Sequence, residues 1–479
     1  MKKITLLLAG LASLLLAHAQ TGYDIAITLK PYKNSHVYLG YYYGKIKALA
    51  DSTLLDEHSS GRFTGKERLP GGIYFIVSPN KEILFETLLD KQQHFSIKAD
   101  TADLPSGIVF SQSRDNAQFQ EYSSFAAQMG KMIEETNRQY AGAKNKQDST
   151  ALAAKAKKLT DRMQHFRDSI GRKYPSSFLA MLFNAMREPK IPPASRHPGG
   201  KYDSNFAYRY YKDHYWEGLS FADERLARTP FFEPKLEKYL NDLVVPNPDS
   251  LIKEVDAMLL QARTSPEMFK YLMVHFVQKY ITPQYMGQDA VFVHLFEKYV
   301  NAGKAEFFTA QYKEFMTKRA YSLMANLIGQ PAADMVMVDT AGKPSSIYKL
   351  PDDFTVICFW DPSCSHCKEV VPKVDSIFKA KWKSQGVQIY GVKVDGPKED
   401  WLKFIHEHHL DGWTHIYQLP SQQEAEIAAG RPGYKQLYDV YQTPVLYLLD
   451  KDKRIIAKKL TYLQIDEVIN LKVQPPKSR

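Results

Sequence analysis

Cysteine is scarce in this sequence of 479 residues, which contains only Cys358, Cys364 and Cys367. A chain that relied on disulfides to hold its fold would carry cysteines throughout its domains. Here all of them lie within one window of ten residues. We therefore expect these thiols to take part in chemistry rather than to cross-link the structure.

Long apolar runs and long runs of one charge are also missing after the N-terminus. No segment beyond the first twenty residues reaches the ~20 apolar residues that a membrane-spanning helix needs, so no transmembrane segment is expected in the mature chain. The net charge is +10, but basic and acidic residues alternate along the helical stretches. This pattern indicates a mixed, solvated surface and no nucleic-acid partner.

The first twenty residues have the order of a secretory signal peptide. Lys2 and Lys3 precede an apolar run, which ends in the small-residue triplet Ala17-His18-Ala19. We predict that residues 1–19 are removed and that the mature chain begins near Gln20, in the periplasm or cell envelope.

The mature chain is too long for a single hydrophobic core. Along it, the pattern of apolar and polar residues changes twice, which divides it into three parts. Residues 20–112 alternate apolar and polar positions between turn signals, and predict an antiparallel β-sandwich. Residues 113–322 show apolar spacings of three and four, and predict a helical middle domain. In residues 323–479 strands alternate with helices, which predicts an α/β domain. The expected fold class is multidomain α+β.

The last of these domains contains the motif Cys364-Ser365-His366-Cys367, between an apolar strand at 355–360 and a helix at 368–382. A thiol at the start of a helix meets unpaired backbone N–H groups and the positive end of the helix dipole, which favour its thiolate. The spacing predicts Cys364 as a nucleophile and Cys367 as the thiol that resolves a mixed disulfide.

Two alternatives remain open from these residues. A Cys-x-x-Cys pair also binds metals, and His366 could add a third ligand for copper, although a closed zinc site needs four. Residues 20–322 could instead make the chain a non-enzymatic envelope-binding protein. The redox interpretation itself requires no metal and no cofactor.

Residues 323–479 resemble the thioredoxin superfamily, and in particular the TlpA-like periplasmic thiol-disulfide oxidoreductases. Trp360 stands four positions before the first cysteine, Pro372 stands five after the second, and Gln442-Thr443-Pro444 precedes a strand. The resemblance implies a cis Thr443–Pro444 bond facing the cysteines, with Thr443, Pro444 and Trp360 as substrate-binding residues. It also implies reductase or isomerase activity on the disulfides of exported proteins, and a membrane-associated redox partner.

The sequence departs from the family pattern at three positions. Cys358 stands where thioredoxins carry a buried acid that moves the proton of the resolving thiol, so we expect an inert core thiol there. Either another carboxylate such as Glu369 substitutes for that acid, or turnover is slower. Ser363 replaces a tryptophan. His366 beside the thiolate would stabilise the reduced form and favour oxidation, so the direction of exchange stays open.

Overall fold

The computed structural model describes residues 22–335 and 337–473, so the predicted signal peptide at 1–19 lies outside the described residues. The chain divides into two compact units, which are treated separately below. The first consists of Met1–Val244 and Met258–Tyr271, and the second of Val245–Ala257 and Leu272–Arg479. The predicted domain boundaries at 112 and 322 stay a prediction.

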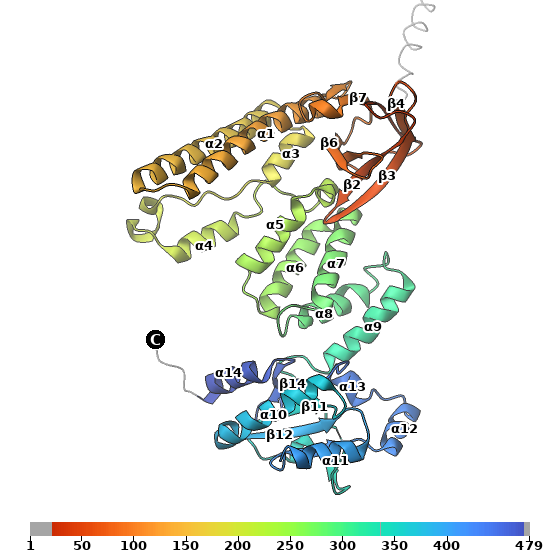
Figure 1. The fold of residues 1–479 in the computed structure, drawn as a ribbon, viewed down its shortest axis with the longest axis vertical. Helices are drawn as coiled ribbons and strands as arrows, with labels where there is room; N and C mark the ends of the chain where they lie inside the picture. Colours follow the sequence, from red (N-terminus) through yellow and green to blue (C-terminus); the bar gives the residue numbers. More distant parts are fainter. Residues whose placement is uncertain (1–21, 336, 474–479) are drawn as a thin grey trace, which may run out of the picture. The chain divides into compact units, whose positions relative to one another are not determined.

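The first unit begins with two four-stranded sheets (Figure 1). One has the strand order β4-β1-β7-β8 and the other β3-β2-β5-β6. Their strands are β1 (Tyr23–Lys30), β2 (His36–Tyr43), β3 (Ile46–Leu54), β4 (Ser60–Gly65), β5 (Gly72–Val77), β6 (Ile83–Leu89), β7 (His94–Asp100) and β8 (Val109–Ser111). Alternate apolar residues such as Ile25, Ile27 and Val37 meet in one buried cluster, which forms the core of the predicted sandwich.

One strand pair differs from the antiparallel prediction, because β1 and β7 run parallel. Parallel neighbours need a crossover connection between them. The chain makes this crossover by forming β2, β3, β5 and β6 in the sandwich before it returns to β1. Alternation of side chains predicts the buried face of a strand but not its direction, so the sequence could not reveal this pair.

Three helices follow the sandwich: α1 (Arg114–Ala141), α2 (Lys146–Lys173) and α3 (Phe178–Ala185). Phe119, Ile170 and Phe178 from these helices share a buried cluster with Ile73 and Phe75 of β5. The helices therefore cover the second face of that sheet, which explains why every residue of β5 is buried.

The remaining helices before the C-terminal sheet confirm the predicted helical middle region. They are α4 (Ser204–Asp213), α5 (Phe232–Lys238), α6 (Pro248–Ala262), α7 (Pro266–Ile281), α8 (Asp289–Leu295) and α9 (Ala310–Met324). Across residues 22–335 and 337–473, no helix combines the length and the apolar character needed to cross a membrane.

The second unit contains a seven-stranded sheet of order β10-β9-β13-β12-β11-β14-β15. Its strands are β9 (Met337–Asp339), β10 (Pro344–Ser345), β11 (Phe354–Trp360), β12 (Val387–Lys393), β13 (Thr414–Tyr417), β14 (Val445–Leu449) and β15 (Ile455–Lys458). Its helices are α10 (Ser365–Ala380), α11 (Lys398–Glu407), α12 (Pro420–Ala428), α13 (Tyr434–Leu437) and α14 (Tyr462–Val473).

The central strand β11 sends alternate side chains to two separate cores. Val356 and Cys358 pack with residues of α10, α11 and α14, whereas Ile357 and Phe359 pack on the opposite face with Tyr434 of α13. A strand buried on both faces has a continuous apolar sequence, and residues 355–360 of β11 show this pattern. The predicted α/β arrangement is confirmed.

Two helices that precede the sheet are also fixed to it within the second unit. Lys458 Nζ of β15 forms a buried ion pair with Asp289 of α8 at 2.5 Å and donates to the Asn326 carbonyl at 2.8 Å. The Ser322 hydroxyl of α9 donates to the Gln436 carbonyl at 2.6 Å. These bonds hold α9 beside the segment that leads into β14.

Candidate functional site

Cys364 lies where the chain passes from β11 into α10. Its backbone is extended, its side chain occupies the N-cap position, and its Sγ atom accepts the N–H of Cys367 at 3.5 Å. The Asp361 carboxylate accepts the N–H of Ser363 at 2.7 Å, which shapes the turn before the cap. The first turn of a helix has N–H groups without helical partners, so this thiol sits where a negative charge is stabilised.

The two thiols of the motif have opposite environments. Burial acts to raise the pKa of the Cys364 thiol, but hydrogen bonds from the Cys367 backbone and the Thr443 side chain outweigh it, and the net pKa is below its ordinary value. Burial raises the pKa of Cys367 to about 12. Cys364 is partly exposed and Cys367 is buried. The Cys364 thiol is therefore accessible and ionises readily, whereas the Cys367 thiol is buried and stays neutral.

Thr443 and Pro444 come to this site from the far end of the domain. The Cys364 Sγ atom lies 3.5 Å from the Thr443 carbonyl oxygen. The Thr443–Pro444 bond is cis, as the resemblance implied. Both residues are partly exposed, so the backbone beside the open thiol is accessible from outside.

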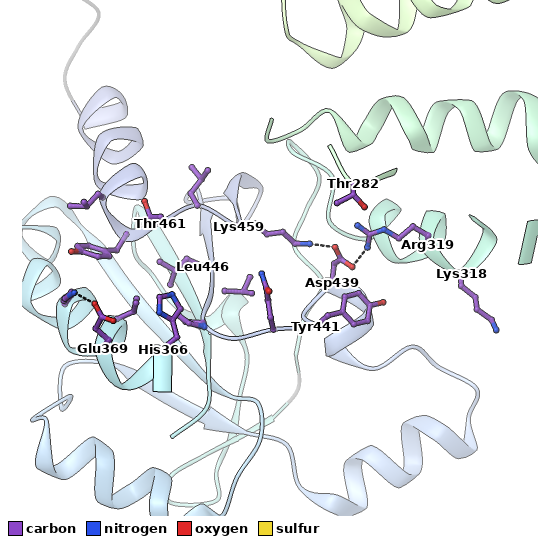
Figure 2. A pocket seen from close by; sticks show the side chains of 18 of the residues that line it. Thr282, Lys318, Arg319, His366, Glu369, Asp439, Tyr441, Leu446, Lys459 and Thr461 are labelled. Carbon is purple, nitrogen blue, oxygen red and sulfur yellow. Dashed lines mark hydrogen bonds and ion pairs between the residues drawn. The ribbon is translucent and has the colours of Figure 1, made fainter. Parts of the chain in front are cut away.

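His366 lies in the first turn of α10 with an exposed side chain. Figure 2 shows its ring on the wall of a cavity of about 920 Å³, which Pro444 also lines. The opposite part of the wall comes from α9, through Phe315, Lys318 and Arg319. Sequence reasoning missed these α9 residues, because no motif connects them to a cysteine pair about fifty residues away.

Comparisons with known proteins identify the family of the C-terminal domain. Residues 328–458 match the AhpC/TSA family. A domain described as a possible thiol-disulfide isomerase from Cytophaga hutchinsonii is 33% identical; the match covers 31% of this chain and 97% of that domain, with a TM-score of 0.27. The chain belongs to the thioredoxin superfamily. Its C-terminal domain is TlpA-like, as the sequence predicted, and is similar to the thiol-disulfide oxidoreductase family.

Other solved structures extend the comparison of the thioredoxin-like domain. A thioredoxin-like protein from Bacteroides caccae is 20% identical; the match covers 60% of this chain and 98% of that one, with a TM-score of 0.45. A thiol:disulfide interchange protein from a Bacteroides species is 24% identical; the match covers 31% of this chain and 93% of that one, with a TM-score of 0.26. Residues 144–318 match a domain of unknown function, DUF5106. No protein of curated function matches the sequence significantly.

Trp360 requires a correction to the predicted substrate-binding set. Its side chain is 0% exposed and packs against Phe404 with ring centroids 5.1 Å apart. A residue buried in this way cannot touch a substrate at the surface of the thioredoxin-like domain. Trp360 instead belongs to the buried cluster against which Cys364 packs.

Cys358 occupies the position at which thioredoxins carry a buried acid. Cys358 is fully buried in the cluster that also contains Cys367, and burial raises the pKa of its thiol. Glu369, the predicted substitute, is exposed and accepts a hydrogen bond from Lys373 at 2.7 Å. The Glu369 carboxylate therefore faces solvent rather than the buried Cys367.

The metal-binding alternative would need ligands beside Cys364, Cys367 and His366. Among the residues that the structure describes, no group of three or more His, Cys, Asp and Glu side chains is placed to hold a metal ion. The Cys-x-x-Cys pair itself supplies two donors at most, whereas structural zinc sites use four.

Proposed function

We propose that the protein is an exported thiol-disulfide oxidoreductase of the reductase or isomerase type, which exchanges disulfides with other envelope proteins through Cys364 and Cys367. The observation that carries this proposal is the contrast between the two thiols. Cys364 is partly exposed with a lowered pKa, and Cys367 is buried with a raised pKa. Exchange needs one thiol that attacks first and one that acts only afterwards.

The reaction follows from this order. The Cys364 thiolate attacks one sulfur of a substrate disulfide, a mixed disulfide forms, and the other substrate sulfur leaves as a thiolate that takes up a proton. Cys367 then loses its proton and attacks Cys364 Sγ, which closes the Cys364–Cys367 disulfide and releases the second substrate thiol. Two electrons pass from the dithiol to the substrate, and an external dithiol, for which we propose a membrane-associated redox partner, restores the pair.

Three neighbouring residues support these steps. The Thr443 backbone lies beside Cys364 and can pair with an extended substrate strand. Pro444 shapes the adjoining surface. His366, two residues after Cys364, tunes the reduction potential, because a cationic ring there stabilises the reduced form.

Cysteine replacements test the proposed roles directly. Cys364→Ser should abolish the reduction of insulin disulfides by dithiothreitol that the protein catalyses. Cys367→Ser should accumulate a mixed disulfide that is visible on a non-reducing gel and by mass spectrometry. Insulin reduction at the wild-type rate by Cys364→Ser would contradict the assignment.

Two further measurements test the export of the protein and the direction of disulfide exchange. A mature N-terminus near Gln20, found by mass spectrometry of protein from the cell envelope fraction, is expected if residues 1–19 are a signal peptide. The reduction potential of the Cys364–Cys367 couple determines the direction of disulfide exchange. A value near ~−270 mV indicates a reductase and a value near ~−120 mV an oxidant.

A further inference from the structure

The cavity beside His366 has walls of different origin within the second unit. One wall comes from α10, the segment 441–446 and the start of α14, and the other from α9 together with Thr282. We call it the α9 cavity. Its volume of about 920 Å³ lies in the range of binding sites that enclose most of a ligand. The α9 wall lies outside the segment that matches the AhpC/TSA family and mostly inside the DUF5106 match.

The α9 cavity adjoins the site of the reactive thiol. His366, two residues after Cys364, and Pro444, one residue after the carbonyl that contacts Cys364 Sγ, both line it. A polypeptide whose cysteine reaches Cys364 therefore has its flanking residues at the mouth of the cavity. This proximity favours, as the occupant, the part of the substrate chain that adjoins its reacting cysteine.

The α9 wall is held in place by buried polar contacts. Figure 2 shows Arg319 of α9 and Lys459 both paired with Asp439, whose side chain is only 1% exposed. The Asn326 side chain, just after α9, donates to the Leu437 carbonyl at 2.9 Å. A wall fixed in this way can select among substrates without first having to fold around them.

The lining combines exposed apolar groups with an excess of positive charge. Phe315, Tyr441 and Leu463 are large, exposed side chains on its walls, and such groupings mark interaction sites. Four lining side chains are Lys or Arg and two are carboxylates. Glu369 pairs with Lys373, Asp439 is shared by Arg319 and Lys459, and Lys318 pairs with Glu314 outside the lining. These four cations and three carboxylates leave one positive charge in excess. The surface therefore complements a peptide with apolar and acidic residues.

We propose that the α9 cavity binds an extended apolar and acidic segment of the substrate protein, adjacent to the cysteine that reacts, and that α9 thereby selects the substrate. This inference rests on the proposed function, because it assumes that Cys364 reacts with protein disulfides. It assigns to the end of the DUF5106 segment a role in substrate recognition.

Activated peptides separate recognition from thiol chemistry. Short peptides with apolar residues and one cysteine coupled to thionitrobenzoate are prepared in acidic and basic forms. The second-order rate constant with reduced protein is measured by stopped flow, in parallel with the small disulfide dithionitrobenzoate. Wild-type protein should react faster with the acidic than with the basic peptide, by roughly three- to tenfold at low salt.

The chain offers matched controls for two variants. Phe315→Ser should slow both peptides several-fold, whereas Tyr321→Ser on the same helix should not; these side chains are 51% and 59% exposed, and only Phe315 lines the cavity. Lys318→Glu should lessen the preference for the acidic peptide, whereas Lys403→Glu should leave it unchanged. Both lysines are exposed, at 74% and 71%, and both pair with a glutamate four residues away.

Each outcome has one meaning. Unchanged dithionitrobenzoate rates with slower peptide reactions in the cavity variants support the proposal. Equal peptide rates in wild type, Phe315→Ser and Lys318→Glu overturn it while the thiol chemistry stands. Loss of reaction with dithionitrobenzoate in the wild-type protein contradicts the proposed function itself.

Discussion

The Sγ atom of Cys364 lies 3.5 Å from the carbonyl oxygen of Thr443, a residue that follows it by 79 positions. The contact forms where β11 ends and β14 begins, because these two inner strands are antiparallel neighbours in the sheet. Cys364 is thus set between a helix N-terminus and an accessible stretch of backbone. This arrangement gives a thiolate that is stabilised and still open to a second polypeptide.

The pH dependence of Cys364 follows from its lowered pKa. The rate of its alkylation by iodoacetamide should rise with pH and reach its plateau at a lower pH than that of free cysteine, near ~8.5. Because the folded pKa is depressed, ionised Cys364 stabilises the reduced protein above the unfolded pKa. This stabilisation is lost as the pH falls through the folded value.

Mass spectrometry after brief alkylation checks the assignment. Cys364 should carry the label first, while Cys367 and Cys358, whose pKa values are raised by burial, should react only after unfolding. A plateau at or above the pH of free cysteine would show that the helix N-terminus does not stabilise this thiolate.

Cys358 should be dispensable for chemistry but not for packing. Its thiol is fully buried in the cluster with Cys367. Cys358→Ala should keep the rate of insulin reduction within about twofold of the wild-type rate, and lower the stability by about 1 kcal/mol, because a small cavity replaces the sulfur. Urea unfolding measures the second effect. A loss of activity comparable to that of Cys364→Ser would give Cys358 a role in exchange.

Asp439 should control the position of α9. Its buried carboxylate is shared by Arg319 and Lys459. Asp439→Ala removes the carboxylate partner of both cations. We expect the free energy of unfolding to fall by about 1–3 kcal/mol and the amide hydrogens of α9 to exchange faster. Glu407→Ala is the control, since it removes an exposed carboxylate from a long contact of 3.9 Å. Unchanged exchange in α9 for Asp439→Ala would mean that other contacts hold the helix.

The sequence predicts best what depends on neighbouring residues. The strand before Cys364, the N-cap position of the thiol and the helix after it all follow from local pattern, whereas the cis Thr443–Pro444 bond follows from the family resemblance of its motif. The burial of Trp360 was not foreseen, because its position in the motif does not say on which side of the strand the ring lies. The wall from α9 depends on Arg319 meeting Asp439 across 120 residues, which no local pattern encodes.

Gly391 tests how closely the sheet is packed beneath the site. It lies in β12 between Cys358 of β11 and His415 of β13. A Cβ atom there would lie 3.0 Å from both His415 Nδ1 and Trp413 Cε3, and 3.5 Å from Trp360 Nε1. Gly391→Ala should therefore displace buried rings that support the Cys364 loop, and destabilise the domain by about 1–3 kcal/mol.

The matched substitution Gly130→Ala should raise the stability, whereas Gly391→Ala should lower it. A Cβ atom at Gly130, inside α1, meets nothing within 4 Å, and alanine is favoured over glycine in a helix by about 0.8–1.0 kcal/mol. Thermal unfolding followed by circular dichroism measures both variants, and insulin reduction shows whether Gly391→Ala also slows exchange. Equal stability of the two variants would show that the rings around Gly391 move aside without cost, and that Trp360 does not depend on this glycine for its position.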